Sequence, residues 1–160
     1  MIKAVIIDDR AEVRSLLREE LMANFHDIEI AMEADSVESG IKSIIAFNPD
    51  VLFLDIELPD GTGFDILDYF IQNNKPIQFK VIFTTAYDQF AVKAFKYSAV
   101  DYLLKPVSTS DLIDAVNRVK ETMAYPFFPA IRQLLLNIQN KKNIINKLTL
   151  PNESGYTIID

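Results

Sequence analysis

Five polar side chains of this chain each stand at or just beyond the end of an apolar stretch: Asp8, Asp9, Asp55, Thr85 and Lys105. Three carboxylates at one place repel one another, and a cation among them relieves that repulsion. A hard divalent ion with oxygen ligands fits such a cluster, and Mg²⁺ suits few protein ligands plus a phosphate better than Ca²⁺ does. Acids, one hydroxyl and one ammonium together indicate phosphoryl chemistry.

The roles within such a site follow from side-chain chemistry. Asp55 follows the apolar run 51–54, which we expect to be the central strand, so it is the candidate nucleophile that forms an acyl phosphate. The Lys105 ammonium and the metal would neutralise charge on the transferring group. The Thr85 hydroxyl would donate to one of its oxygens.

The same acids could instead serve only as helix caps. Asp8 and Asp9 could serve only the N-terminus of the helix that follows them, where backbone N–H groups favour negative charge. Asp55 could cap the next helix in the same way. The elements around these residues decide between the two interpretations.

Hydrophobic periodicity predicts five strands alternating with five helices. The strands are expected at 2–7, 27–34, 51–54, 80–85 and 101–104, and the helices around 13–21, 35–47, 64–71, 91–95 and 110–123. In the second strand, Ile28, Ile30 and Met32 should share one face, and Asp35 with Glu38 should cap the helix that follows.

This alternation predicts an α/β fold in which a five-stranded parallel sheet is doubly wound by helices, because short connections leave a crossover helix as the economical return. Ligands of such sheets bind beyond the carboxyl ends of the strands. Four strands would deliver the five polar side chains to that one edge.

Composition excludes several classes of protein. The 160 residues contain no cysteine, so disulfides and thiolate metal sites are excluded. Residues 1–122 carry 12 Lys and Arg against 21 Asp and Glu, whereas residues 123–160 carry 4 against 2. An acidic body is a poor match for nucleic acid on its own. No apolar run approaches a membrane span and no signal peptide is evident, so we expect a cytoplasmic protein with no membrane partner.

Residues 1–122 resemble the receiver domain of two-component response regulators. The resemblance rests on a set of short motifs, each placed after a predicted strand: Asp8-Asp9, Asp55 with Pro59-Asp60-Gly61, Thr85-Ala86, and Tyr102-Leu-Leu-Lys105-Pro106. It implies a flavodoxin-like sheet with strand order 2-1-3-4-5. It also implies a phosphoacceptor that catalyses only its own phosphorylation and dephosphorylation and is otherwise not an enzyme.

The same resemblance assigns roles to residues. A sensor histidine kinase would donate its phosphoryl group to Asp55, with Mg²⁺ held by Asp8, Asp9, Asp55 and the backbone carbonyl of Glu57. Lys105 would then pair with the phosphate. Phosphorylation would draw Thr85 inward and let Tyr102 turn from exposed to buried. Arg10 departs from the acid that this family favours after the acid pair, which removes no ligand.

The stretches 83–95 (FTTAYDQFAVKAF) and 100–106 (VDYLLKP) are similar to regulators of the LytTR type, the LytR/AlgR-like subfamily, whose output domain binds DNA. The expected organisation is a receiver domain at 1–122, a linker with a helix at 123–147, and the start of a truncated LytTR-type domain at 148–160. Apolar residues at 131–148 suggest a C-terminal helical extension. DNA would be reached only through the missing output domain, and a homodimer is a candidate assembly.

Two other functions compete with this interpretation. A phosphatase like the haloacid dehalogenases also uses an aspartate after an apolar strand together with Mg²⁺. It needs a second acid two residues on, where this chain offers Glu57, and it leaves Lys105 unexplained. A pseudo-receiver would bind a partner without being phosphorylated, although the phosphoacceptor set is intact.

Overall fold

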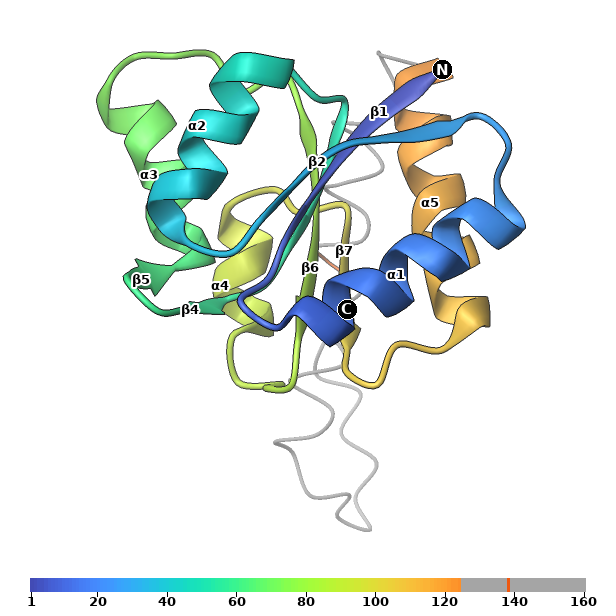
Figure 1. Cartoon of the computed structure of the whole chain (residues 1–160). Coiled ribbons are helices and arrows are strands. Elements are labelled where there is room, and N and C mark those ends of the chain that lie inside the picture. Colours follow the sequence, from blue (N-terminus) through green and yellow to red (C-terminus); the bar gives the residue numbers. More distant parts are fainter. Residues whose placement is uncertain (125–137, 139–160) are drawn as a thin grey trace, which may run out of the picture. The chain divides into compact units, whose positions relative to one another are not determined.

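A computed structural model describes residues 1–124 and residue 138. Strands and helices alternate along this part of the chain (Figure 1). The elements are β1 (Ile2–Ile7), α1 (Ala11–Asn24), β2 (Ile28–Ala34), α2 (Val37–Phe47), β3 (Val51–Leu54), β4 (Glu57–Leu58), β5 (Gly61–Thr62), α3 (Gly63–Gln72), β6 (Lys80–Thr85), α4 (Ala91–Lys96), β7 (Asp101–Leu104) and α5 (Thr109–Ala124).

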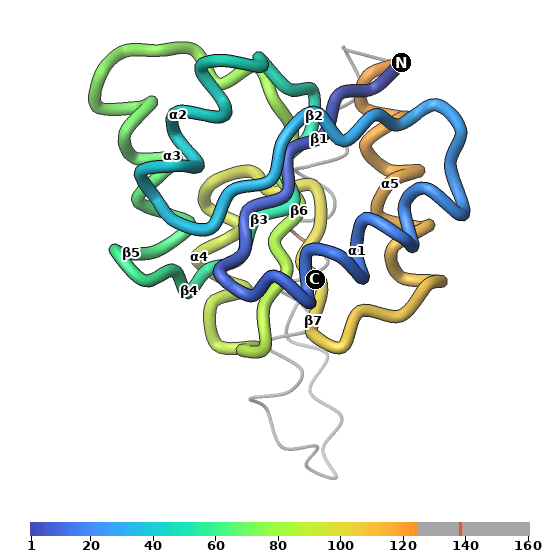
Figure 2. The backbone as a smooth tube through the Cα atoms, viewed as in Figure 1, coloured from blue at the N-terminus to red at the C-terminus, as the bar shows by residue number. Residues whose placement is uncertain are grey.

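Five strands form one parallel sheet in the order β2-β1-β3-β6-β7, which confirms the predicted 2-1-3-4-5 arrangement. The strands run through the middle of the domain with helices on either side, as the tube in Figure 2 shows. The doubly wound α/β fold predicted from the sequence is therefore present, and β3 is its central strand.

Alternation along the strands builds a core on each face of the sheet. In β1, Val5 and Ile7 face α2, α3 and α4, whereas Ala4 and Ile6 face α1 and α5. The first core holds aromatic side chains such as Phe64, Phe70 and Phe83, and the second is filled mainly by aliphatic side chains. Because both faces of the sheet are covered, its central strand β3 is wholly apolar and β1 nearly so, which is typical of parallel sheets.

The alternation predicted for β2 holds for only part of the strand. Ile28 and Ile30 belong to the α1–α5 side, but Met32 is 43% exposed and Ala34 packs on the opposite side. The cause is a register shift: Ala4 pairs with Ile30 and the next residue of β1 pairs with Met32. A bulge of this kind inserts one residue and reverses the faces beyond it.

Two local predictions were wrong or incomplete. The N-cap of α2 is Ser36, whose hydroxyl accepts from the Ser39 N–H, so the expected pair of Asp35 and Glu38 does not form the capping box. The Pro/Gly-rich turn after Asp55 contains a short antiparallel pair, β4 with β5, that was not predicted. The cap of α3 is Thr62, so Asp55 does not cap that helix.

The expected linker with its helix at 123–147 and the expected start of a further domain at 148–160 lie almost entirely outside the described residues. Residues Met1–Glu121 form one compact unit. Among the described residues, no helix has both the length and the apolar content needed to cross a bilayer.

Candidate functional site

Three carboxylates meet at the carboxyl edge of the sheet, beyond β1 and β3. Asp8, Asp9 and Asp55 each offer one oxygen, and these oxygens lie within 4.8 Å of one another. Asp8 and Asp55 are buried and Asp9 is exposed, so the cluster has one open side. Hard oxygen donors gathered this closely fit a small divalent cation such as Mg²⁺.

Lys105, at the end of β7, joins two of these acids. Its Nζ donates to Asp8 Oδ2 at 2.5 Å and to Asp55 Oδ2 at 3.0 Å. The other oxygen of each acid holds a local turn: Asp8 Oδ1 accepts from the Arg10 N–H, and Asp55 Oδ1 accepts from the Ile56 N–H. Asp8 therefore serves the start of α1, as the simpler interpretation held, and the cluster as well.

Burial shapes the electrostatics of this group. It raises the pKa of Asp55, and the Lys105 charge only partly offsets that effect while the Asp8 charge adds to it. Burial also opposes the charged form of Lys105, but the hydrogen bond to Asp8 and the charge of Asp55 outweigh it and raise the lysine pKa. Lys105 is therefore charged, and Asp55 lies in a poorly solvated environment.

The two residues expected to switch come from neighbouring strands: Thr85 ends β6, and Tyr102 of β7 pairs with Phe83 of β6. Thr85 is fully buried, and its Oγ1 accepts from the Tyr87 backbone N–H at 3.3 Å. Tyr102 is half-buried, and its hydroxyl donates to the Tyr87 carbonyl. The backbone of Tyr87 thus contacts both residues, a role that no pattern in the sequence signals.

The hairpin beyond Asp55 carries Glu57 and Asp60. The Glu57 side chain is exposed and is not one of the three clustered carboxylates. Asp60 reaches the first turn of α2, where its two oxygens accept from the Val37 and Glu38 N–H groups at 2.7 and 3.0 Å. These two hydrogen bonds lower the pKa of Asp60 and fasten the hairpin to α2.

Two arginines lie beside the acid pair. Arg10 forms an exposed ion pair with Glu12. Arg14 was missed in the sequence: its Nη1 donates to the Asp8 carbonyl at 2.6 Å, and its Nε lies 3.6 Å from Glu33. Its position in the first turn of the predicted helix was the only available signal. Arg14 steadies the turn that presents Asp8 and Asp9.

Helix α3 begins directly against the backbone of Asp55. A Cβ added at Gly63 would lie 2.4 Å from the Asp55 carbonyl oxygen, so only glycine fits there. The next residue, Phe64, packs its ring 5.0 Å from that of Phe83 and 5.1 Å from that of Tyr97. Phe83 in turn lies 6.4 Å from Tyr102. A row of aromatic rings therefore connects β7 with α4.

Comparison with known proteins fits this geometry. Residues 4–117 match the family model described as the response regulator receiver domain. The chain is 30% identical to the sensory transduction protein LytT of Bacillus cereus, over all of this chain and 63% of that protein. It is 37% identical to the transcriptional regulatory protein BtsR of Escherichia coli, over 76% of this chain and 49% of that protein.

A solved receiver structure has the same fold. The receiver domain of AraT, a response regulator from Geobacillus stearothermophilus, is 31% identical with a TM-score of 0.70, covering 78% of this chain and 97% of that one. The fold and the acidic sheet edge define a signalling module rather than a conventional enzyme. The chain belongs to the response regulator receiver family, and its relatives include LytTR-type regulators. It spans between about half and two thirds of the two curated relatives.

Proposed function

We propose that Asp55 accepts a phosphoryl group from a sensor histidine kinase in a reaction that needs Mg²⁺. The observation that carries this proposal is the contact of Lys105 Nζ with both Asp55 and Asp8 at the carboxyl edge of β3. An aspartate that ends the central strand, beside two acids and a fixed ammonium, has the groups that phosphoryl transfer requires.

The ligand set would consist of the Asp8, Asp9 and Asp55 side chains with the backbone carbonyl of Glu57. When bound, the ion would supply positive charge beside the phosphoryl oxygens. An Asp55 oxygen attacks phosphorus as the bond from phosphorus to the donor nitrogen breaks, and that nitrogen leaves with a proton. Burial leaves the Asp55 carboxylate poorly solvated, which favours attack.

Lys105 would change its hydrogen-bond partner once Asp55 carries a phosphoryl group. Its ammonium exchanges Asp55 Oδ2 for a phosphoryl oxygen, and the Thr85 hydroxyl turns from the Tyr87 N–H to another phosphoryl oxygen. Loss of that contact changes the Tyr87 backbone, which also accepts from Tyr102. Thr85 and Tyr102 would therefore move together when Asp55 is modified.

The domain would act as the input of a longer regulator. The boundary near residue 122 is supported by the family match, which ends at residue 117. The similarity to LytT extends over the whole chain, which is consistent with a linker at 123–147 and the start of a second domain at 148–160. DNA binding would belong to a LytTR-type output domain that begins at 148, and phosphorylation would favour a homodimer through α4, β7 and α5. A sensor histidine kinase takes its phosphoryl group from ATP. Transfer of that group to Asp55 would therefore take place in the cytoplasm.

The test is intact-mass spectrometry after incubation with Mg²⁺ and a small acyl phosphate. We expect one phosphoryl adduct, lost in Asp55→Asn and in the presence of EDTA, with size measurement on the same sample to follow dimerisation. Absence of an adduct in a folded protein would overturn self-phosphorylation and favour the pseudo-receiver.

Glu57→Gln is the matched control. Because the proposed ligand is the backbone carbonyl of residue 57, this variant should be phosphorylated like the parent chain. The phosphatase alternative predicts that loss of the Glu57 carboxylate abolishes activity, together with turnover of simple phosphate esters by the parent chain. Turnover that depends on Glu57 would therefore replace the receiver proposal.

A further inference from the structure

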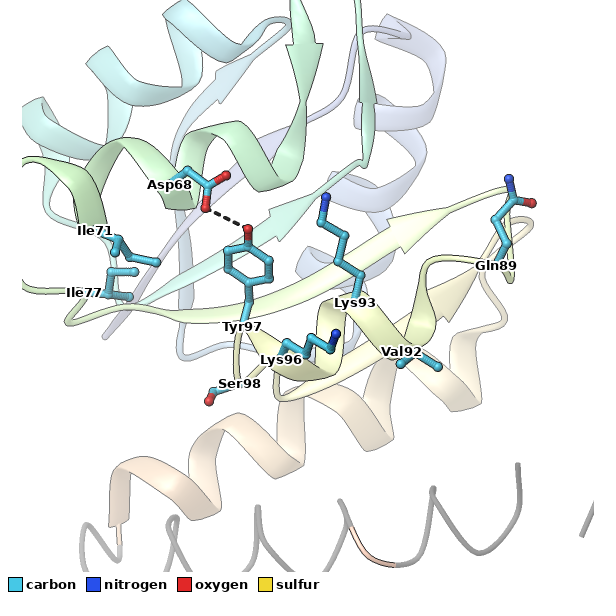
Figure 3. A pocket seen from close by; sticks show the side chains of 9 residues that line it. All are labelled: Asp68, Ile71, Ile77, Gln89, Val92, Lys93, Lys96, Tyr97 and Ser98. Atoms are coloured by element: carbon cyan, nitrogen blue, oxygen red, sulfur yellow. Dashed lines mark hydrogen bonds between the residues drawn. The ribbon is translucent and has the colours of Figure 1, made fainter. Parts of the chain in front are cut away.

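A depression of about 800 Å³ lies between α3 and α4, away from the acidic cluster (Figure 3). Three apolar side chains on its walls are exposed: Ile71 by 54%, Ile77 by 41% and Val92 by 51%. Tyr97 forms part of the lining, and its hydroxyl donates to Asp68 at 2.7 Å. We call this depression the α3–α4 groove.

The charge of the groove is opposite to that of the domain around it. Lys93 and Lys96 of α4 line it, with Asp68 as the one carboxylate of the lining. Lys93 Nζ lies 4.6 Å from the centre of the Phe64 ring, and no ion pair joins either lysine to a carboxylate in the part of the chain that the structure describes. The neutral Tyr97 hydroxyl leaves the Asp68 charge in place, so two lysines against one carboxylate give the lining a net positive charge.

The chain's own C-terminal part has the wrong charge to fill this groove. Residues 131–148 are rich in apolar side chains, but their charged residues are all basic: Arg132, Lys141, Lys142 and Lys147. Placing them beside Lys93 and Lys96 would bring like charges together.

We propose that the α3–α4 groove docks an acidic amphipathic helix of a partner protein. Apolar side chains on one face of such a helix would contact Ile71, Ile77 and Val92, and carboxylates beside that face would pair with Lys93 and Lys96. Apolar contact supplies affinity, and the two lysines select partners of negative charge. The lining of the groove shares no residue with the acidic cluster, so this proposal does not rest on the phosphorylation of Asp55.

The test uses the full chain and a labelled synthetic helix with leucines on one face and glutamates on the other. Fluorescence anisotropy should detect binding that weakens as salt rises, because the lysines are exposed. We expect the double variant Lys93→Glu/Lys96→Glu to weaken binding at least tenfold and Val92→Ser to weaken it severalfold. Lys42→Glu, on the exposed face of α2, is the matched control and should bind like the parent chain.

Three outcomes would overturn the proposal. One is absence of binding by the acidic helix. Another is equal loss in Lys42→Glu, which would show general charge attraction. The third is self-association of the unphosphorylated chain, measured by light scattering, that Lys93→Glu/Lys96→Glu abolishes, since the occupant would then be a second copy. Amide NMR shifts centred on Ile71, Val92 and Lys96 would support the proposal.

Discussion

At the scale of single residues, the sequence predicted which side chains gather but not how they pair. The acids, Thr85 and Lys105 could be assigned to the ends of strands, because parallel strands deliver their carboxyl ends to one edge. The bridge from Lys105 to both Asp8 and Asp55, and the contact of Arg14 with the Asp8 carbonyl, depend on side-chain paths between distant elements. No local pattern encodes such paths.

Replacing Asp55 by Asn should stabilise the protein in the absence of metal. Burial raises the Asp55 pKa, so its charge costs folding free energy above the ordinary value of 3.8 and nothing below it. We expect Asp55→Asn to raise the free energy of unfolding by roughly 1 kcal/mol at pH 7. The gain should vanish as the pH falls below 3.8. Urea unfolding in EDTA, followed by circular dichroism, measures both effects.

Lys105→Met should have the opposite effect and lower the free energy of unfolding. It leaves Asp8 and Asp55 without their cation and should cost about 2 to 3 kcal/mol under the same conditions, since removing one partner of a buried pair is expensive. Added Mg²⁺ should restore part of that loss. Equal stability of Lys105→Met and the parent chain in EDTA would contradict the electrostatic account of the site.

At the scale of elements, the predicted strands and helices are present, and the errors have definite physical causes. The bulge in β2 reverses the faces of Met32 and Ala34, and a strictly alternating pattern cannot signal an inserted residue. The cap of α2 was misjudged by one position because Asp35 and Ser36 are both good cap residues. The β4–β5 hairpin is too short to leave a periodic signal.

The tie between the hairpin and α2 gives a pH-dependent prediction. Hydrogen bonds from Val37 and Glu38 lower the Asp60 pKa, so the stability that they contribute is present above the ordinary value of 3.8 and is lost as pH falls through the lowered pKa. Asp60→Asn should therefore lower the urea midpoint at pH 7, and its difference from the parent chain should shrink in acid.

Glu29→Gln is the control, because Glu29 is an exposed acid on β2 that takes no part in this contact. A difference between Asp60→Asn and the parent chain that stays constant from pH 7 to pH 2.5 would mean that the carboxylate charge is not what fastens the hairpin.

At the scale of the molecule, Met1–Glu121 is a compact unit with a core on each face of its sheet. A shortened chain of residues 1–124 should therefore fold alone, with a cooperative urea transition and the same metal-dependent phosphoryl adduct as the full chain. Its free energy of unfolding should differ from that of the full chain's receiver transition by less than about 1 kcal/mol. Aggregation or a non-cooperative transition would contradict the domain boundary.

The position of Lys105 between Asp8 and Asp55 has a consequence for cooperativity. The ammonium neutralises two of the carboxylates that a divalent ion would use, so the ion and the lysine compete until the lysine gains another anionic partner. A phosphoryl group on Asp55 would be that partner. If Asp55 is phosphorylated as proposed, metal binding and phosphorylation would favour each other by the same factor, and the response to either would become steeper when the other is present.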